Sequence, residues 1–225
     1  MIRLAATLAL FLSIVFTSCM KGSSGTGDPN PYRPIQKDTV STGQMWGLTI
    51  GETSSNIYTM LQDIRTEKQI SYLGVVGNVF SDLSQIQEKI PLYNSLFMDE
   101  TAGTPTGIQL GFEASKVKLI YMNNGTPLSK WPSINDFQNG ITIGDSISTL
   151  YDKLVAIKNV AVYGDKLQRL SLFDKNLTAP FDPGMTGSTQ WQVVTTTVNK
   201  RWQLLELNFS SGTLASIYYT LYENY

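Results

Sequence analysis

The sequence contains no histidine and a single cysteine, Cys19. A Ser-His-Asp triad, a Cys-His pair and an ordinary zinc site each need residues that this chain lacks. A single cysteine also cannot form an internal disulfide. These absences exclude most hydrolase chemistry, so we predict a protein that is not an enzyme, with no catalytic residues, no metal site and no cofactor.

Charged residues are scarce as well, at 16% of the chain, and the formal net charge is −1. Such a chain has no strong field to attract nucleic acid or an anionic membrane surface. We therefore expect no nucleic-acid partner. Hydrophobic residues make up 42% of the chain, which is enough for the packed core of one or two small domains.

Three local patterns look like catalytic or metal motifs, but each has a simpler interpretation. Ser115 to Lys118 matches Ser-x-x-Lys, yet it lies in an alternating stretch that predicts strands, and its companion motifs are missing. The adjacent acids Asp99 and Glu100 would point to opposite faces of a strand, unlike a glycosidase pair. Asp182 begins a turn sequence without the acidic pattern of a calcium loop.

The first eighteen residues have the organisation of a secretory signal. Arg3 precedes an apolar run from Leu4 to Phe16, which is shorter than the roughly 20 residues that a transmembrane helix needs. Small residues follow, and Cys19 comes directly after them. This arrangement resembles the lipobox of bacterial lipoproteins, in which the cysteine is acylated and becomes the first residue of the mature protein.

The resemblance implies that residues 1–18 are removed and that lipid on Cys19 anchors the protein to a membrane of the cell envelope. Residues 19–42 are rich in Gly, Ser, Pro and Asp and predict a flexible linker. Position 20 is Met rather than aspartate and no acidic cluster lies nearby, which favours the periplasmic side of an outer membrane over surface display. The alternative is a spare thiol in an ordinary cleaved signal or a short membrane anchor.

A motif near the start of the remaining chain occurs twice. Residues 47–64 recur ninety-three positions later at 140–157, with a shared Gly-x-Thr-Ile-Gly-acid start and then Tyr, Leu and Ile at helical spacing. A tight turn followed by a helix fits each copy. We therefore predict an internal duplication, with one repeat at 43–133 and another at 134–225.

The motif has a local structural explanation. In the first copy Gly51 permits a turn that other residues resist, Glu52 meets the positive end of the helix, Ser54 caps it and Ile50 folds back onto it. A phosphate-binding loop would need more glycines and a lysine. The second copy offers the same roles to Ile143, Gly144, Asp145 and Ser146.

Strand patterns follow each helix. Alternating residues predict strands within 108–122 and 191–206, and a last strand within 214–222. Asn124-Gly125 suits a type I′ hairpin. The tripeptides at 95–97 and 171–173, both Ser-Leu-Phe, would be equivalent strands of the two repeats. Residues 83–90 predict a second helix in the first repeat, whereas 159–168 fit a helix or a strand.

These elements predict an α+β fold of two tandem repeats, each with one or two helices packed on one face of a three- to four-stranded antiparallel sheet. The repeated unit resembles the β-lactamase-inhibitor-protein-like fold, shared with small outer-membrane lipoproteins of the BamE (SmpA/OmlA) type. The resemblance covers about residues 43–225. It implies two sheets side by side that present a concave, aromatic-lined surface to another protein.

Aromatic residues of the predicted strands and turns are the candidates for such a surface, because Trp and Tyr are favoured at interface centres. Each of them has a core position as its alternative. We expect a membrane-anchored, non-enzymatic envelope lipoprotein that binds or scaffolds a protein partner. The alternative is a carrier of a small molecule, peptide or glycan in an aromatic groove between the repeats. The candidate residues are Tyr121, Trp131, Trp191, Trp202, Tyr218, Tyr219 and Tyr222.

Overall fold

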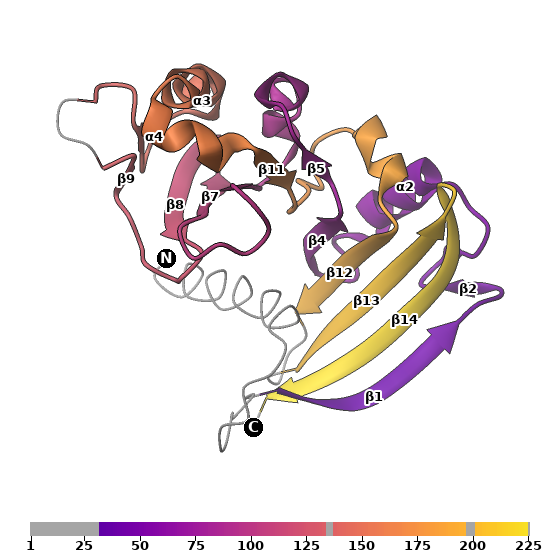
Figure 1. The fold of residues 1–225 in the computed structure, drawn as a ribbon. Helices are drawn as coiled ribbons and strands as arrows, with labels where there is room; N and C mark the ends of the chain where they lie inside the picture. The colour runs from indigo at the N-terminus through magenta and orange to yellow at the C-terminus, as the bar shows by residue number, and fades with distance from the viewer. Residues whose placement is uncertain (1–31, 134–136, 197–200, 225) are drawn as a thin grey trace. The chain divides into compact units, whose positions relative to one another are not determined.

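The computed structural model describes residues 32–133, 137–196 and 201–224. The longest strands lie side by side in a five-stranded antiparallel sheet, which we call sheet I (Figure 1). Alternating apolar and polar residues in β12 to β14 bury one face of this sheet. In spatial order its strands are β1 (Tyr32–Val40), β14 (Thr213–Asn224), β13 (Arg201–Ser210), β12 (Gln190–Thr196) and β4 (Ile70–Val76).

A second five-stranded antiparallel sheet, sheet II, is built from shorter strands. Its order is β5 (Val79–Phe80), β11 (Arg169–Leu172), β6 (Ser95–Asp99), β7 (Ile108–Glu113) and β8 (Lys116–Met122). Two small ribbons complete the strands. They pair β2 (Gln44–Met45) with β3 (Leu48–Thr49), and β9 (Lys130–Trp131) with β10 (Ile141–Thr142).

The described helices are short. They are α2 (Ser54–Ile64), α3 (Leu150–Lys158) and α4 (Ala161–Gly164), with 3-10 turns at Leu83–Ile86, Ile90–Leu92, Ile147–Thr149, Asp165–Leu167 and Pro183–Gly187. The helix predicted over 83–90 is instead two 3-10 turns, and Pro91 contributes to this by disfavouring the α-helical conformation of Ile90 before it. Of residues 159–168, which fitted a helix or a strand, residues 161–167 are helical.

The predicted fold class is wrong. Among the described residues, strands account for 44% and helices, 3-10 turns included, for 23%, with three short α-helices and several sheets, so this part of the protein is mostly β. The α+β description of helices packed on one sheet per repeat fails because strands outweigh helices and the second helix expected in the first repeat is only two 3-10 turns. It also fails because the sheets do not follow the predicted repeats.

Each half of the sequence contributes a strand to the sheet of the other half. β4 belongs to the first half, but it pairs with β12 of the second half, next to β13 and β14 in sheet I. β11 reciprocally pairs with β6 of the first half. The two Ser-Leu-Phe segments are consequently not equivalent strands of two repeats. They lie side by side, with Leu172 opposite Leu96 and Ser171 opposite Phe97.

The two motif copies also bind across the halves. The Gly51 amide donates to the Leu214 carbonyl at 2.8 Å, and the Leu214 amide donates to the Glu52 carbonyl at 2.8 Å. The second copy repeats this on the other hairpin, where the Gly144 amide donates to Val117 at 2.8 Å. Each motif therefore fastens onto the tight β-hairpin of the opposite half.

The local predictions for the motif are partly confirmed. Gly51 and Gly144 have φ values of +94° and +97°, as a turn that favours glycine requires. Ser146 caps its helical turn, but Thr53, not Ser54, caps α2 by accepting from the Asn56 amide. Ile50 packs against the core as predicted, whereas Ile143 is 48% exposed and does not, and Ile141 fills the core position of the second copy instead, at 0% exposure.

The predicted type I′ turn lies elsewhere. Gly125 has a positive φ but Asn124 does not, so that hairpin is of another type. Positive φ at both central residues occurs instead at Ala114-Ser115, between β7 and β8, and at Ser211-Gly212, between β13 and β14.

Part of the predicted linker is a strand. Within 19–42, residues Tyr32–Val40 form β1 at the edge of sheet I and pair with β14. Pro34 fits there because an edge strand has one side free of ladder bonds, and the register shifts between Pro34 and Gln36. The signal segment 1–18, Cys19 and the first part of the linker lie outside the described residues.

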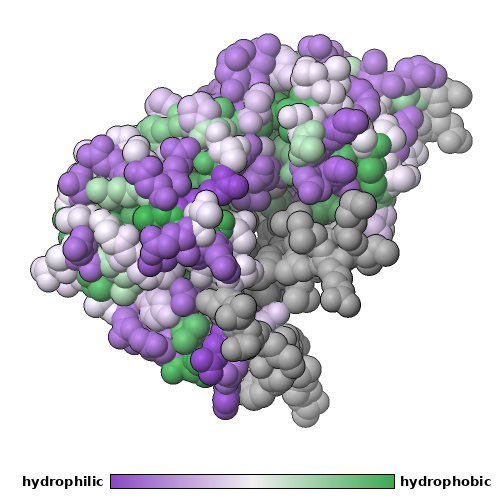
Figure 2. Space-filling view, turned by 180° about the vertical axis from the view of Figure 1, so that it is seen from behind, coloured by the Kyte–Doolittle hydropathy of each residue, from purple (hydrophilic) through white to green (hydrophobic). Residues whose placement is uncertain are grey.

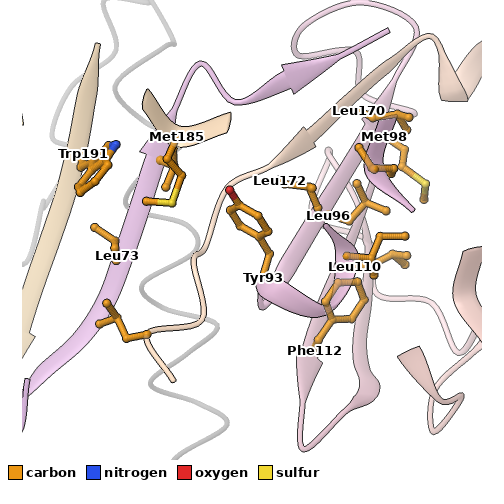
Figure 3. Close-up of a cluster of buried hydrophobic side chains, with 14 of the residues drawn as sticks. Leu73, Tyr93, Leu96, Met98, Leu110, Phe112, Leu170, Leu172, Met185 and Trp191 are labelled. Atoms are coloured by element: carbon orange, nitrogen blue, oxygen red, sulfur yellow. The ribbon is translucent and has the colours of Figure 1, made fainter. Parts of the chain in front are cut away.

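One hydrophobic cluster runs through both sheets. In Figure 3 the ring of Tyr93 lies between side chains of the two sheets, with Leu73 and Trp191 on one side and Leu96 and Leu110 on the other. Backbone bonds from residues 173–175 to β4 join the sheets at this place. Among the described residues, no helix has the length and hydropathy to span a bilayer.

Candidate binding surface

Helix α2 covers one face of sheet I. Tyr58 of α2 meets Trp191 of β12 edge to face, with ring centroids 6.5 Å apart. In the sheet, Trp191 lies opposite Leu207, which lies opposite Ile217, and all three are 0% exposed. These side chains form the core side of the sheet.

The other face of sheet I carries side chains of a different kind. Because side chains alternate along a strand, the row formed by Gln192, Glu206 and Tyr218 points away from α2. Trp202 and Tyr222 form a parallel row four residues along. We call this surface the Glu206 face; its residues are Gln190, Gln192, Val194, Trp202, Leu204, Glu206, Asn208, Ser216, Tyr218, Thr220 and Tyr222.

One end of the Glu206 face is polar and the other is aromatic. At the polar end the Gln190 amide donates to Asn208 Oδ1 at 3.0 Å, and Asn208 Nδ2 donates to Ser216 Oγ at 3.3 Å. At the aromatic end the rings of Trp202 and Tyr222 stack with centroids 4.0 Å apart and an interplanar angle of 7°. The stacked Trp202 and Tyr222 rings provide a large aromatic area at this end of the face.

Glu206 lies between these two ends. Within the described residues its carboxylate has no hydrogen bond and no ion pair. Burial raises the pKa of the Glu206 carboxyl above its usual range. Burial raises the pKa of Tyr222 too, and the nearby charge of Glu206 adds to that rise. The face thus holds a half-buried carboxylate whose hydrogen-bonding capacity is unused by the described part of the chain.

The structure brings together three of the seven predicted surface residues: Trp202, Tyr218 and Tyr222 share the Glu206 face. Tyr218 is 46% exposed, whereas Trp202 is 6% exposed and mostly covered. Glu206 was missed by the sequence analysis, although it follows Trp202 and Leu204 at the same alternating spacing, which is the signal that places it on this face.

The other four predicted residues lie elsewhere. Trp191 is in the core, and Tyr219 is on the α2 side of β14 because it is one position from Tyr218. Tyr121 is on β8 of sheet II, in a bridge with Pro127. Trp131 is 6% exposed on β9 and meets Tyr163 edge to face at 5.9 Å. These positions confirm the core alternative for Trp191 and Trp131.

A depression of about 450 Å³ lies between residues of the two halves. Amide and hydroxyl groups dominate its lining, and its aromatic residues, Tyr93 and Phe112, are themselves almost fully buried. Glu113 is the single charged residue there. The residues that line it are Pro91, Tyr93, Asn94, Phe112, Glu113, Ala114, Ser115, Ser146, Ile147, Ser148, Asn176 and Thr178.

A buried polar cluster lies where the two sheets join. Asp182 is 0% exposed, accepts from Lys89 Nζ at 2.5 Å and from the Tyr93 hydroxyl at 2.7 Å, and caps a 3-10 turn through the Gly184 amide. Despite burial, which opposes ionisation, these hydrogen bonds hold the pKa of Asp182 below its usual value. Both carboxylate oxygens accept hydrogen bonds from within the fold, which fits a structural role for the cluster.

Lys175 is the most unusual member of this region, because it is 1% exposed. Its Nζ donates to the Leu92 and Asn176 carbonyls at 2.9 and 3.2 Å and lies 5.1 Å from the Tyr58 ring centroid. Burial lowers the pKa of Lys175 to about 8, and the charge of Asp182 opposes this effect. No sequence pattern predicted that Lys175 would be buried.

The residues weighed as catalytic candidates have structural positions. Ser115 occupies the tight β7–β8 turn at φ +59°. Asp99 accepts from the Thr104 amide and hydroxyl and from Asn123, which closes the 99–107 loop. Glu100 pairs with Lys166. Across the described ranges, no three His, Cys, Asp or Glu side chains are grouped as metal ligands would be.

Comparisons with protein-family models, with curated proteins and with solved structures gave no match.

Proposed function

We propose that this chain is a non-enzymatic lipoprotein of the cell envelope that binds another protein through the Glu206 face of sheet I. In this proposal acylated Cys19 anchors it in the outer membrane, on the periplasmic side. The signal-like start and the position of Cys19 support the anchor. The partner is a protein rather than a nucleic acid because the chain has almost no net charge.

The observation that carries the binding proposal is the composition of the Glu206 face. Protein interfaces favour Tyr and Trp, and their centres combine aromatic area with a few polar groups. Tyr218 is exposed beside a half-buried carboxylate, and a rigid Trp202–Tyr222 pair adjoins them. On the side of the molecule shown in Figure 2, by contrast, apolar side chains form small groups among polar ones.

The proposed anchor would keep this face near the membrane. Thirteen residues, 19–31, separate Cys19 from the first residue of β1. Fully extended, they reach at most about 45 Å. A partner in the same membrane, or close to it, is therefore within reach.

Site-specific photo-crosslinking in intact cells tests the proposal. A photoreactive amino acid in place of Tyr218 is expected to give a discrete crosslink to an envelope protein, whereas one in place of Val162 is the matched control because that side chain is 77% exposed on α4. Cys19→Ser should abolish labelling by palmitate and weaken the crosslink. Equal crosslinking at both sites, or none at Tyr218, would contradict the proposal.

A second candidate function is binding of a small molecule, peptide or glycan, and the depression between the two halves favours it. Its many hydroxyl and amide groups suit a neutral, hydrogen-bonding ligand. Thermal-shift screening of envelope metabolites and oligosaccharides, with Asn176→Ala as the comparison variant, would detect such a ligand. A stabilisation that the variant does not reduce would place the ligand elsewhere.

A further inference from the structure

We propose that the partner docks by placing a lysine or arginine side chain against the carboxylate of Glu206, beside Tyr218 and the Trp202–Tyr222 pair. This inference rests on the proposed function and specifies the chemistry of the partner at that site. Three steps lead to this inference: the unpaired carboxylate, the cations of the described residues and the aromatic surroundings.

The first step is the state of Glu206. A carboxylate has about four acceptor positions, and Glu206 uses none of them within the described residues. Partial burial makes this arrangement costly, because the charged form loses hydration without gaining a partner. A cation brought by a second protein would remove this cost.

The second step is the absence of a suitable cation on the described part of the same chain. Arg33 and Arg201 both bind Glu223, which is on the opposite side of β14 from Tyr222. The nearest lysine by strand register is Lys37 of β1, whose row runs through Thr220 and not through Glu206. Glu206 lies opposite Tyr218 and then Thr39. Lys37 is two strands away and forms no ion pair with it.

The third step is the aromatic surroundings. Tyr218 lies directly opposite Glu206, and the charge of Glu206 influences Tyr222. The face of an aromatic ring attracts a cation, and the stem of lysine or arginine can pack on Leu204 between the two rows. A carboxylate beside tyrosines therefore favours a basic side chain. Hydroxyl groups of a glycan would satisfy the carboxylate but would not use this attraction.

The experiment uses the full-length protein in detergent and observes the Tyr218 ring and the Glu206 carboxyl by NMR. The probe is N-acetyl-arginine amide, its neutral analogue is N-acetyl-citrulline amide, and a neutral oligosaccharide is the third ligand. We expect the arginine probe alone to shift both signals and to lower the pKa of Glu206. Glu206→Gln should weaken its binding by about tenfold or more, since a hydrogen bond to a charged group is lost. Glu88→Gln, at an exposed residue outside both candidate sites, should not.

Several results would overturn the inference. They are equal binding of the citrulline analogue, binding of the oligosaccharide in place of the arginine probe, or no response up to the solubility of the arginine probe. The crosslinking experiment separates this failure from that of the proposed function. A Tyr218 crosslink that is equally strong in the Glu206→Gln variant would leave protein binding intact and refute the role of the basic side chain.

Discussion

Replacing Lys175 with methionine should change how the stability of this protein depends on pH. Methionine keeps much of the length of the side chain and removes the charge that the fold buries beneath Tyr58. The wild-type lysine has a pKa of about 8 in the folded chain, against 10.5 when unperturbed. The unfolded chain therefore binds more protons between these values, and the contribution of Lys175 to stability rises with pH across that window.

The magnitude follows from the two pKa values. Each pKa unit corresponds to about 1.4 kcal/mol, so the full difference is about 3 kcal/mol. Between about pH 7 and pH 9.5 the linkage relation gives a rise of about 2 kcal/mol in the free energy of unfolding of the wild type relative to the variant. The range stops below pH 10 because tyrosines of the unfolded chain ionise there, and burial raises the pKa of Tyr58 to about 12 in the fold.

Urea unfolding of both proteins at a series of pH values measures this difference directly. The control is Lys118→Met, since Lys118 is exposed on β8. Its curve should stay parallel to that of the wild type. Parallel curves for Lys175→Met would refute the reasoning, because they would mean that the lysine keeps the same pKa in the folded and unfolded chains.

Three further predictions concern other buried or strained positions. Burial raises the pKa of Asp174 from 3.8 to about 7. The folded chain therefore binds more protons than the unfolded chain between these values, and the free energy of unfolding of the wild type should fall by up to about 4 kcal/mol relative to Asp174→Asn as pH rises from about 4 to 7. The same urea unfolding series measures this change. Gly51→Ala and Gly144→Ala should each cost about 1 to 2 kcal/mol because of their positive φ, whereas Gly187→Ala, with no positive φ and open space around it, should cost much less in thermal unfolding. Asp182→Asn should lower the free energy of unfolding by about 3 kcal/mol, because Lys89 loses its charged partner at a largely buried site; an unchanged midpoint would contradict this role.

Local features of the sequence predicted local structure well. Period-two alternation located β7, β8, β12 and β13, and the repeated glycines indicated positive φ. The cap at Thr53 was displaced by one residue, which is the usual precision of such signals. These predictions succeeded because strand alternation and turn geometry depend mainly on neighbouring residues.

The pairing of strands that are distant in the chain could not be predicted from the sequence patterns. Nothing in β4 indicates that it joins β12 rather than β6, since either neighbour would bury Leu73 and Val75. The same ambiguity made the two Ser-Leu-Phe segments look like copies, when similar apolar strands also pair with each other. β1 was missed because its proline, Pro34, and its polar residues suit an edge strand as well as a linker.

In the candidate site, too, local alternation was predictable from the sequence and strand pairing was not. Alternation placed Trp202, Tyr218 and Tyr222 among surface candidates, but only the register of β13 with β14 shows that they share a face with Glu206. Lys175 gave no signal at all, because its burial results from residues 173–176 crossing between the sheets.

Charge reversal at the Glu206 face shows whether a basic side chain of the partner binds this carboxylate. Once the protein crosslinked through Tyr218 is identified, Glu206→Arg is introduced together with replacement of the partner's nearest lysine or arginine by glutamate. The account predicts that Glu206→Arg alone abolishes the crosslink and that the double exchange restores it. A crosslink that survives Glu206→Arg, or is not restored by the exchange, would contradict the account.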